Sequence, residues 1–200
     1  MIKYVYILIV FVLLGNVVSA QNDYKYALKG GVGYFSKLNA ENLGTVAWFE
    51  GGFNTSNGFY TNIRVAYGAM TNILGNEYGP FEGQTMLSLY FMSNITFTRP
   101  INFYGNHFFE PGVGVHYTRG YSNSPSYDVS VEYDDYEDSF VVYLGIDAGY
   151  EPYNNAGLTI VADYYYQFNN GFYLGLRTDF YSSAFLFEAI TVSPVFGIRF

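Results

Sequence analysis

The sequence predicts an all-β fold: a closed antiparallel up-and-down transmembrane β-barrel of eight to ten strands with its apolar face outward. Three observations lead to this prediction. Apolar and polar residues alternate along most of the chain, turn residues recur every ten to twenty positions, and charged residues are few. Of 200 residues, 50% are hydrophobic and 22% aromatic, but only 13% are charged. The 23 tyrosines and 19 phenylalanines favour strands and membrane interfaces.

The composition also excludes several classes of protein. The chain has no cysteine, which rules out a disulfide scaffold and a cysteine-ligated metal site. The formal net charge of -8 disfavours a broad contact with nucleic acid, so no nucleic-acid partner is expected. No cofactor is expected either. The length suits one domain of ordinary size.

Residues 1–20 have the pattern of a cleaved signal peptide. Lys3 precedes an apolar run from Tyr4 to Leu14, and residues 18–20 resemble a small-x-small cleavage site. A retained membrane anchor needs about 20 apolar residues, but Gly15 and Asn16 interrupt the run. No later stretch is long and apolar enough for a membrane-spanning helix. The prediction is therefore a signal peptide at 1–20 and a single barrel domain at 21–200.

The period-two pattern defines the strands in order. We expect them near residues 26–37, 44–55, 59–70, 85–98, 108–120, 139–150, 157–168, 172–182 and 188–200. The pairs Asn57-Gly58 and Asn170-Gly171 predict tight hairpin turns, because both residue types accept a positive φ. Nine strands is an odd number, whereas bacterial single-chain barrels have an even one. Either Tyr127 to Asp134 form a tenth strand, or one segment belongs to an extracellular hairpin and the barrel has eight.

The charged residues decide which face of each strand points outward. A Lys or Arg on the lipid side near the bilayer midplane costs about 2 to 4 kcal/mol, so these residues are expected inside the barrel. Aromatic residues flank the predicted turns, at Phe53, Phe59 and Tyr60 and again at Phe168, Phe172 and Tyr173, as in membrane-interface belts. The expected interior charges are Lys29, Glu50, Arg64, Glu110, Asp147, Asp163, Arg177, Asp179 and Arg199.

The last ten residues carry a resemblance to a known family. Val192, Pro194, Phe196, Ile198 and Phe200 share one face of the last strand, and the sequence ends on phenylalanine. This pattern resembles the small bacterial outer-membrane β-barrel proteins, with Gly197, Ile198 and Phe200 matching the signal read by the barrel-assembly machinery. The resemblance implies an outer-membrane location and contact with outer-membrane lipid and lipopolysaccharide. Pro194 departs from the pattern, because proline cannot donate to a strand ladder.

Two clusters are candidate sites. Asp134, Asp135, Glu137 and Asp138 offer carboxylates to a divalent cation, although they lack the ligand order and the glycine of a known calcium loop, which favours a solvated loop. His116, Glu110 and Ser122 offer a base, a carboxylate and a hydroxyl, the groups of a hydrolase or acyltransferase. No nucleophile motif accompanies them, and an interior histidine bonded to a carboxylate is more often structural. Trp48 is expected to fill the interior or lie at an interface.

The function predicted from these observations is non-enzymatic. The barrel would display loops near residues 71–84 and 121–138 for adhesion, contact with a surface ligand or envelope integrity. One alternative is a lipid-modifying enzyme of the lipid A deacylase or acyltransferase type, with His116 as base. A second is a narrow pore of low conductance. A third is a soluble periplasmic barrel of the lipocalin sort.

Overall fold

The computed structural model of the chain describes residues 24–37, 43–56, 58–73, 85–134, 139–183 and 186–200. Within 122–134 and 139–151 it describes the backbone. The predicted signal peptide, residues 1–20, lies outside the described residues. No helix among these residues is long and apolar enough to cross a membrane.

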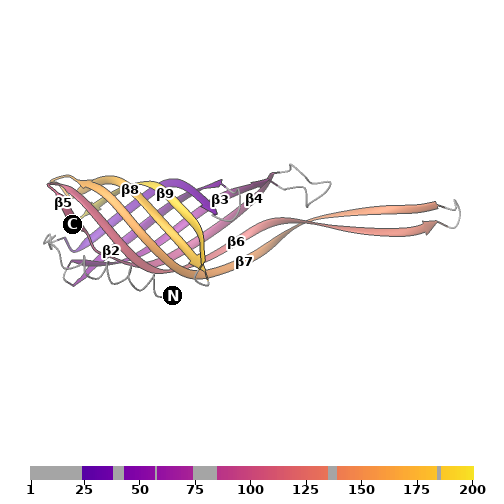
Figure 1. Ribbon diagram of the computed structural model, residues 1–200, viewed down its shortest axis with the longest axis horizontal. Coiled ribbons are helices and arrows are strands. Elements are labelled where there is room, and N and C mark those ends of the chain that lie inside the picture. The colour runs from indigo at the N-terminus through magenta and orange to yellow at the C-terminus, as the bar shows by residue number, and fades with distance from the viewer. Residues whose placement is uncertain (1–23, 38–42, 57, 74–84, 135–138, 184–185) are drawn as a thin grey trace.

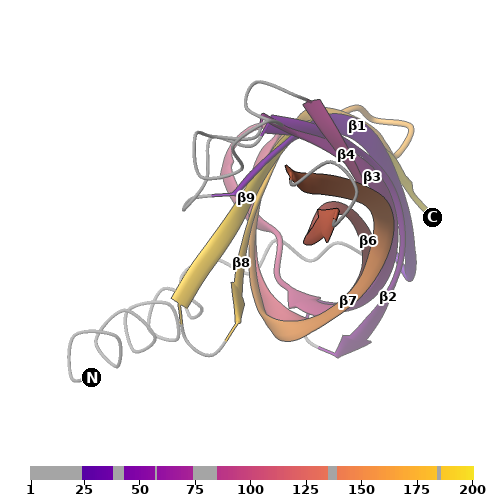
Figure 2. The same cartoon turned by 90° about the vertical axis from the view of Figure 1, so that its right-hand side faces the viewer.

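The structure is a closed barrel of eight antiparallel strands with one short additional strand, and it confirms the predicted fold class (Figures 1 and 2). Strands adjacent in sequence are adjacent in the barrel. β1 also pairs with β9, and β4 pairs with β6, which closes the sheet. The barrel strands are β1 (Tyr26–Lys37), β2 (Leu43–Ser56), β3 (Phe59–Ile73), β4 (Thr85–Thr98), β6 (His107–Asp134), β7 (Ser139–Gln167), β8 (Phe172–Ser183) and β9 (Leu186–Arg199). The short β5 (Ile101–Tyr104) pairs with the start of β6.

The two longest strands resolve the strand count. The sequence predicted separate strands at 108–120, 139–150 and 157–168, with 127–134 as a possible tenth. Instead, β6 runs without a break for 28 residues and β7 for 29. The predicted breaks were wrong because continuous β6–β7 pairing, from His107 opposite Tyr166 to Asp134 opposite Ser139, carries both strands across them. The barrel therefore has eight strands, the second of the two alternatives.

β6 and β7 continue well beyond the barrel wall. β6 pairs with β4 only as far as Ser122, and β7 pairs with β8 only from Leu158. Residues 123–134 and 139–150 pair with each other alone, and we call them the hairpin extension. Figure 1 shows this ribbon projecting from one end of the barrel. Twelve residues of strand span about 40 Å.

The opposite end of the barrel has short turns. Gly58, Gly105 and Gly171 have φ angles of 79°, 55° and 83°, in the region that glycine enters without strain. Gly58 and Gly171 belong to the two turns predicted from their Asn-Gly pairs. In the second turn, Phe168 N donates to Phe172 O (2.7 Å) and Gly171 N to Phe168 O (3.0 Å).

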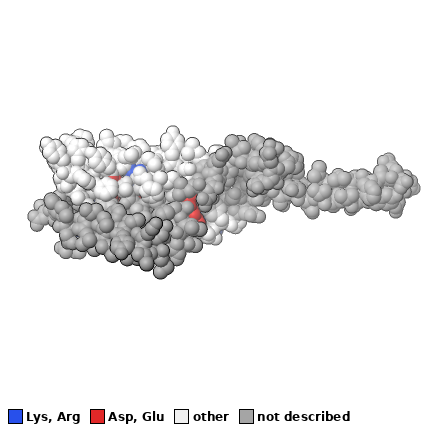
Figure 3. Space-filling model, in the orientation of Figure 1, with Lys and Arg blue, Asp and Glu red and all other residues white. Residues whose placement is uncertain are grey.

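The burial pattern is the reverse of that in a soluble protein. Large apolar side chains point outward, as Val32 (64% exposed) and Ile63 (57%) illustrate, whereas Glu50 and Arg177 are fully buried. On the face seen in Figure 3, the described surface shows few charged residues. Most charged side chains of the described barrel thus lie in the interior, and the outer wall is largely apolar.

Interior packing depends on tyrosines that lie over glycines of the neighbouring strand. Gly68 pairs with Tyr90, Gly120 with Tyr153, and Gly197 with Tyr173. In each pair, a Cβ on the glycine would collide with the tyrosine ring. Aromatic cover of a glycine on the next strand pins the strand register.

Pro194 has a local effect on the barrel seam. The β1–β9 ladder runs from Ala27 to Gly30 and resumes from Tyr34 to Lys37, which leaves a gap opposite residues 193–195. Proline has no N–H to donate, which accounts for weak pairing beside it. The departure noted in the sequence therefore interrupts one ladder, and β9 still pairs with β8 through this region.

Candidate functional site

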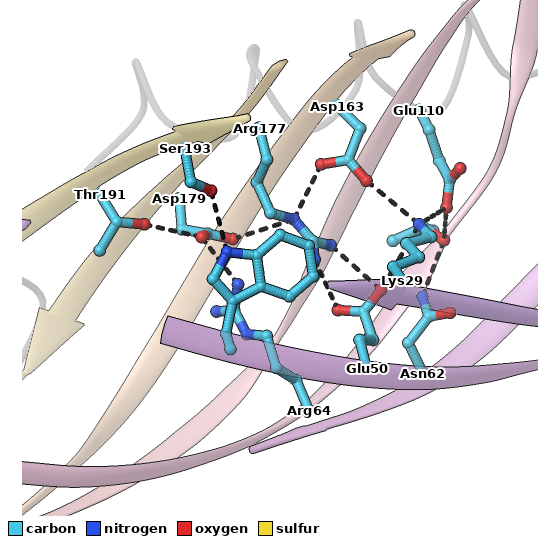
Figure 4. A network of polar contacts seen from close by, with 12 residues as sticks. Lys29, Glu50, Asn62, Arg64, Glu110, Asp163, Arg177, Asp179, Thr191 and Ser193 are labelled. Carbon is cyan, nitrogen blue, oxygen red and sulfur yellow. Dashed lines mark hydrogen bonds and ion pairs between the residues drawn. The ribbon is translucent and has the colours of Figure 1, made fainter. Parts of the chain in front are cut away.

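The barrel interior contains one continuous group of charged side chains, which we call the ion-pair network (Figure 4). Seven of the eight barrel strands contribute to it, so the ion pairs connect opposite walls. It consists of Lys29 (β1), Glu50 (β2), Arg64 (β3), Glu110 (β6), Asp163 (β7), Arg177 and Asp179 (β8), and Arg199 (β9).

The strand register brings these charges together. Lys29 lies directly opposite Glu50, but Glu110 lies opposite Asp163, a repulsive pair of like charges. Lys29 removes this repulsion from across the lumen: its Nζ lies 2.6 Å from Glu110 Oε1, 3.1 Å from Asp163 Oδ2 and 3.4 Å from Glu50 Oε1. Two walls that are far apart in sequence are thereby joined by one ammonium group.

Arg177 occupies the centre of the network. Its Nη1 lies 2.9 Å from Glu50 Oε2, and its Nε lies 2.8 Å from Asp163 Oδ1 and 3.6 Å from Asp179 Oδ1. Asp179 in turn pairs with Arg64 at 2.7 Å and accepts a hydrogen bond from Thr191. The planar guanidinium can serve several carboxylates at once, which a lysine ammonium does with less geometric precision.

Aromatic rings hold the arginines in place. Arg199 pairs with Glu110 and lies 4.9 Å from the centroid of Tyr165, with the rings of Tyr60 and Tyr173 at 5.3 and 5.2 Å. The expectation that Tyr60 and Tyr173 belong to an outer aromatic belt was wrong. Each follows an outward phenylalanine by one residue, so the period of two turns it into the barrel.

Trp48 fills the interior beside the network. Its ring lies under Arg177 (4.5 Å) and Arg64 (5.7 Å), and its Nε1 donates to Ser193 Oγ at 2.9 Å. Towards the hairpin end the interior becomes apolar, with Phe35 packed on Tyr90 at a centroid distance of 4.8 Å. The interior is thus an ionic layer beneath an apolar layer, both filled by side chains.

Asp147 does not belong to this interior. Its backbone lies in the hairpin extension, opposite Ser126, where β7 pairs with no strand other than β6. The expectation was wrong because the strand containing Asp147 continues past the barrel, so alternation alone could not show that no lumen surrounds it. Without Asp147, the network has four basic and four acidic residues and no net charge.

The structure does not bring His116, Glu110 and Ser122 together. They lie at six-residue intervals along β6, so His116 is about 20 Å of strand from each of the other two, and Glu110 is about 40 Å from Ser122. Glu110 is bound by Lys29 and Arg199, and it accepts a hydrogen bond from Thr98. His116 Nδ1 lies 3.1 Å from Thr159 Oγ1, and its ring packs edge-on against Tyr181. The side chains of Glu110 and His116 thus have other contacts, and only the backbone of Ser122 is described, opposite Ser88 and Glu151.

The proposed cation site falls almost wholly outside the described residues. Asp135, Glu137 and Asp138 lie there, and only the backbone of Asp134 is described, opposite Ser139 at the end of the hairpin extension. Within the described part of the chain, no group of three or more histidine and carboxylate side chains is placed to hold a metal ion.

The proposed assembly-signal residues lie on β9 or just after it. Gly197 provides the space beside Tyr173, and Phe200 is exposed on the outer wall, 5.8 Å from the ring of Tyr26. Ile198 pairs with Leu28 on β1 and with Phe172 on β8. These residues therefore contribute to the barrel seam itself.

Sequence reasoning missed the polar and aromatic partners of the network. Thr98, Thr191 and Gln167 bond Glu110, Asp179 and Arg199 respectively. Their inward phase was readable from the alternation. Their partners were not, because each bond depends on the packing of strands across a closed ring.

Comparison with solved structures identifies the same architecture in several proteins. Neisserial surface protein A superposes with a TM-score of 0.54 at 10% sequence identity, over 88% of this chain and 96% of that one. OprG of Pseudomonas aeruginosa gives 0.53 at 10%, over 88% and 96%. Ail, the attachment invasion locus protein of Yersinia pestis, gives 0.51 at 8%, over 88% and 99%.

The chain matches known proteins by structure and not by sequence. No protein-family model matches the chain, and no curated protein matches its sequence. At 8 to 10% sequence identity, the structural likeness concerns the fold alone. The closed eight-stranded topology and the largely apolar outer wall of this chain agree with that fold. The protein has the fold of the small bacterial outer-membrane β-barrel proteins.

Proposed function

We propose that the protein is an integral, non-enzymatic outer-membrane barrel whose hairpin extension contacts a ligand outside the cell. One observation carries the proposal. Residues 123–134 and 139–150 form a long ribbon beyond the barrel (Figure 1). Inside the described barrel, inward side chains such as Glu50, Tyr165 and Arg177 are fully buried, so they fill the interior. A filled interior leaves little space for a substrate or an ion path, whereas the ribbon presents new surface away from the wall. Ail, a structural neighbour, is named for attachment and invasion.

The outer wall supports a membrane location. Arg99 N donates to Pro111 O, which sets Arg99 level with Pro111, and the next described cation on this face is Arg119, eight residues along β6. Between them, the outward residues of β6 are Val113, Val115 and Tyr117. Eight residues span about 26 Å of strand, or about 20 Å after strand tilt, comparable to the roughly 25 Å apolar band of such barrels.

This placement implies an orientation. Outer-membrane barrels have short periplasmic turns and longer extracellular loops. The turns at Gly58, Gly105 and Gly171 would therefore face the periplasm, and the hairpin extension would face outward from the cell. Exposed aromatics near both rims, such as Phe168 and Tyr121, suit the two interfaces.

The sequence of the extension suggests the charge of its ligand. Residues 123–150 contain seven Asp and Glu and no Lys, Arg or His: Asp128, Glu132, Asp134, Asp135, Glu137, Asp138 and Asp147. A polyanion would be repelled by this segment, whereas a basic surface would be attracted at low ionic strength. We propose a basic partner.

Shortening the extension tests this role. In the variant, residues 123–150 are replaced by Asn-Gly, which joins Ser122 to Glu151 through a tight turn. Vesicles carrying the full-length chain should adhere several-fold more to polylysine-coated surfaces than vesicles carrying the shortened chain. The difference should shrink as salt rises to 1 M, because screening weakens exposed charges. Heparin-coated surfaces serve as the anionic control and should retain both poorly. Equal adhesion of two folded barrels to polylysine would refute the proposal.

The non-enzymatic part of the proposal has its own test. Mass spectra of outer-membrane lipids from wild-type, deletion and His116→Ala strains should coincide, because His116 and Glu110 are too far apart to act together. A lipid species that appears or disappears in both altered strains would identify the surroundings of His116 as an active site and would overturn the proposal.

A further inference from the structure

An apolar groove of about 430 Å³ crosses the outer wall of the barrel near the short-turn end. It lies where β1, β2 and the last residue of the chain meet. Its sides are formed by large apolar side chains and its floor by two glycines. The residues that define it are Tyr26, Leu28, Gly51, Gly52, Phe53 and Phe200.

Gly51 creates the groove. The β1–β2 register places Leu28 opposite Gly51 and Tyr26 opposite Phe53, so Gly51 stands on the outward face among large residues. A Cβ added there would have Leu28 Cδ2, at 3.9 Å, as its nearest neighbour, which is ordinary van der Waals contact. The wall is therefore bare at this point although there is room for a side chain.

One cation lies at the rim of the groove. Lys25 N donates to Phe200 O (3.1 Å), and Asn54 N donates to Lys25 O (2.8 Å), so the backbone of Lys25 links β2 to the end of the chain. Its exposed ammonium lies 5.5 Å from the ring centroid of Tyr26. Lys25 forms no ion pair with a carboxylate among the described residues.

We propose that this groove binds one acyl chain of a glycerophospholipid whose phosphate is held by Lys25. The inference rests on the proposed membrane location, which puts the short-turn end in the periplasmic leaflet. A lipid chain fits better than a peptide, because the β1–β2 and β2–β3 ladders already pair the backbone of the floor. An incoming strand would find no free backbone donors there, whereas methylene groups need none.

The test measures lipid retained by the full-length chain. The protein is reconstituted in palmitoyl-oleoyl phosphatidylglycerol vesicles and extracted in mild detergent, and its bound lipid is counted by native mass spectrometry. Gly51→Leu fills the groove. Ala47→Leu is the matched control, because Ala47 lies on the same strand and the same outward face. Lys25→Gln removes the charge, and Lys25→Arg keeps it.

The expected result is a selective loss. The fraction of protein carrying one phosphatidylglycerol should fall about tenfold in Lys25→Gln, since a charged hydrogen bond is worth about one such factor. It should fall about tenfold in Gly51→Leu as well, because the leucine side chain occupies the space of the acyl chain. Ala47→Leu and Lys25→Arg should stay within about twofold of wild type. Dioleoylglycerol, which has acyl chains but no phosphate, should be retained less and should not respond to Lys25→Gln. Gly51→Ala adds one carbon atom and replaces Gly51→Leu if that variant folds poorly. It should also lower the amount of bound lipid.

The outcomes separate this site from the membrane location itself. If the chain resists a carbonate wash but Gly51→Leu retains as much lipid as Ala47→Leu, the groove is not a lipid site. If Lys25→Gln retains as much as wild type, the phosphate contact is refuted. If carbonate removes the wild-type chain from the vesicles, the proposed membrane location is refuted, and the lipid site that rests on it is refuted as well.

Discussion

Arg177→Met is expected to lower the free energy of unfolding by about 3 to 5 kcal/mol, because removal of one partner from a buried ion pair leaves the remaining charges buried and unpaired. Arg177 contacts three carboxylates, those of Glu50, Asp163 and Asp179, all fully or almost fully buried. After the substitution, Lys29 and Arg64 remain nearby, which is too little positive charge for the carboxylates present. Urea unfolding of the chain in detergent micelles, followed by far-UV circular dichroism, measures the change.

Two further variants make this prediction specific. Arg119→Met removes an exposed arginine of the outer face and should change stability by no more than about 1 kcal/mol. Adding Asp163→Asn to Arg177→Met should recover at least about 1 kcal/mol, because it removes one of the stranded charges. If Arg177→Met and Arg119→Met unfold at the same urea concentration, the ion-pair network does not stabilise the barrel.

Val115→Arg is expected to lower the free energy of unfolding in lipid vesicles by about 2 to 4 kcal/mol, the cost of a cation at the midplane on the lipid face. Val115 is 54% exposed on the outer wall, and it lies four residues from Pro111 and four from Arg119. It is thus halfway between the levels of the two outward cations. Urea titration of refolded protein in phospholipid vesicles gives the value.

A second arginine substitution, nearer the edge of the apolar band, tests whether the cost depends on depth in the membrane. Thr71 is also exposed outward and pairs with Leu87, beyond the level of Arg119, so Thr71→Arg should cost only about 0 to 1 kcal/mol. Val115→Leu tests side-chain size without charge and should be close to neutral. Equal losses for Val115→Arg and Thr71→Arg would mean that the apolar band does not lie in a bilayer as proposed.

Strand positions were predictable wherever the alternation had two different faces. Residues 59–70 alternate branched or aromatic residues with small, polar or charged ones, and β3 begins at Phe59 as expected. The prediction failed at 121–126 and 151–156, where prolines and several small polar residues resemble a loop. Pairing between β6 and β7 overrode that local signal, because each strand supplies a continuous partner for the other.

The candidate site shows the same division. The inward phase of Lys29, Glu50 and Arg177 was readable, because a charge facing lipid is costly. Which carboxylate each base contacts was not. Lys29 and Glu110 are 81 residues apart in the sequence, and their contact exists only because the sheet closes on itself.

By itself, the sequence determined the class of fold, which face of each barrel strand points outward, and the two Asn-Gly turns. These features depend on the two-residue alternation of side chains and on residue chemistry. The tertiary structure decided the number of strands, the exclusion of Asp147 from the interior and the length of the hairpin extension. It also decided which carboxylate each base contacts and that Gly51 leaves a groove. These features depend on the register between strands and on barrel closure, which join residues that no local pattern relates.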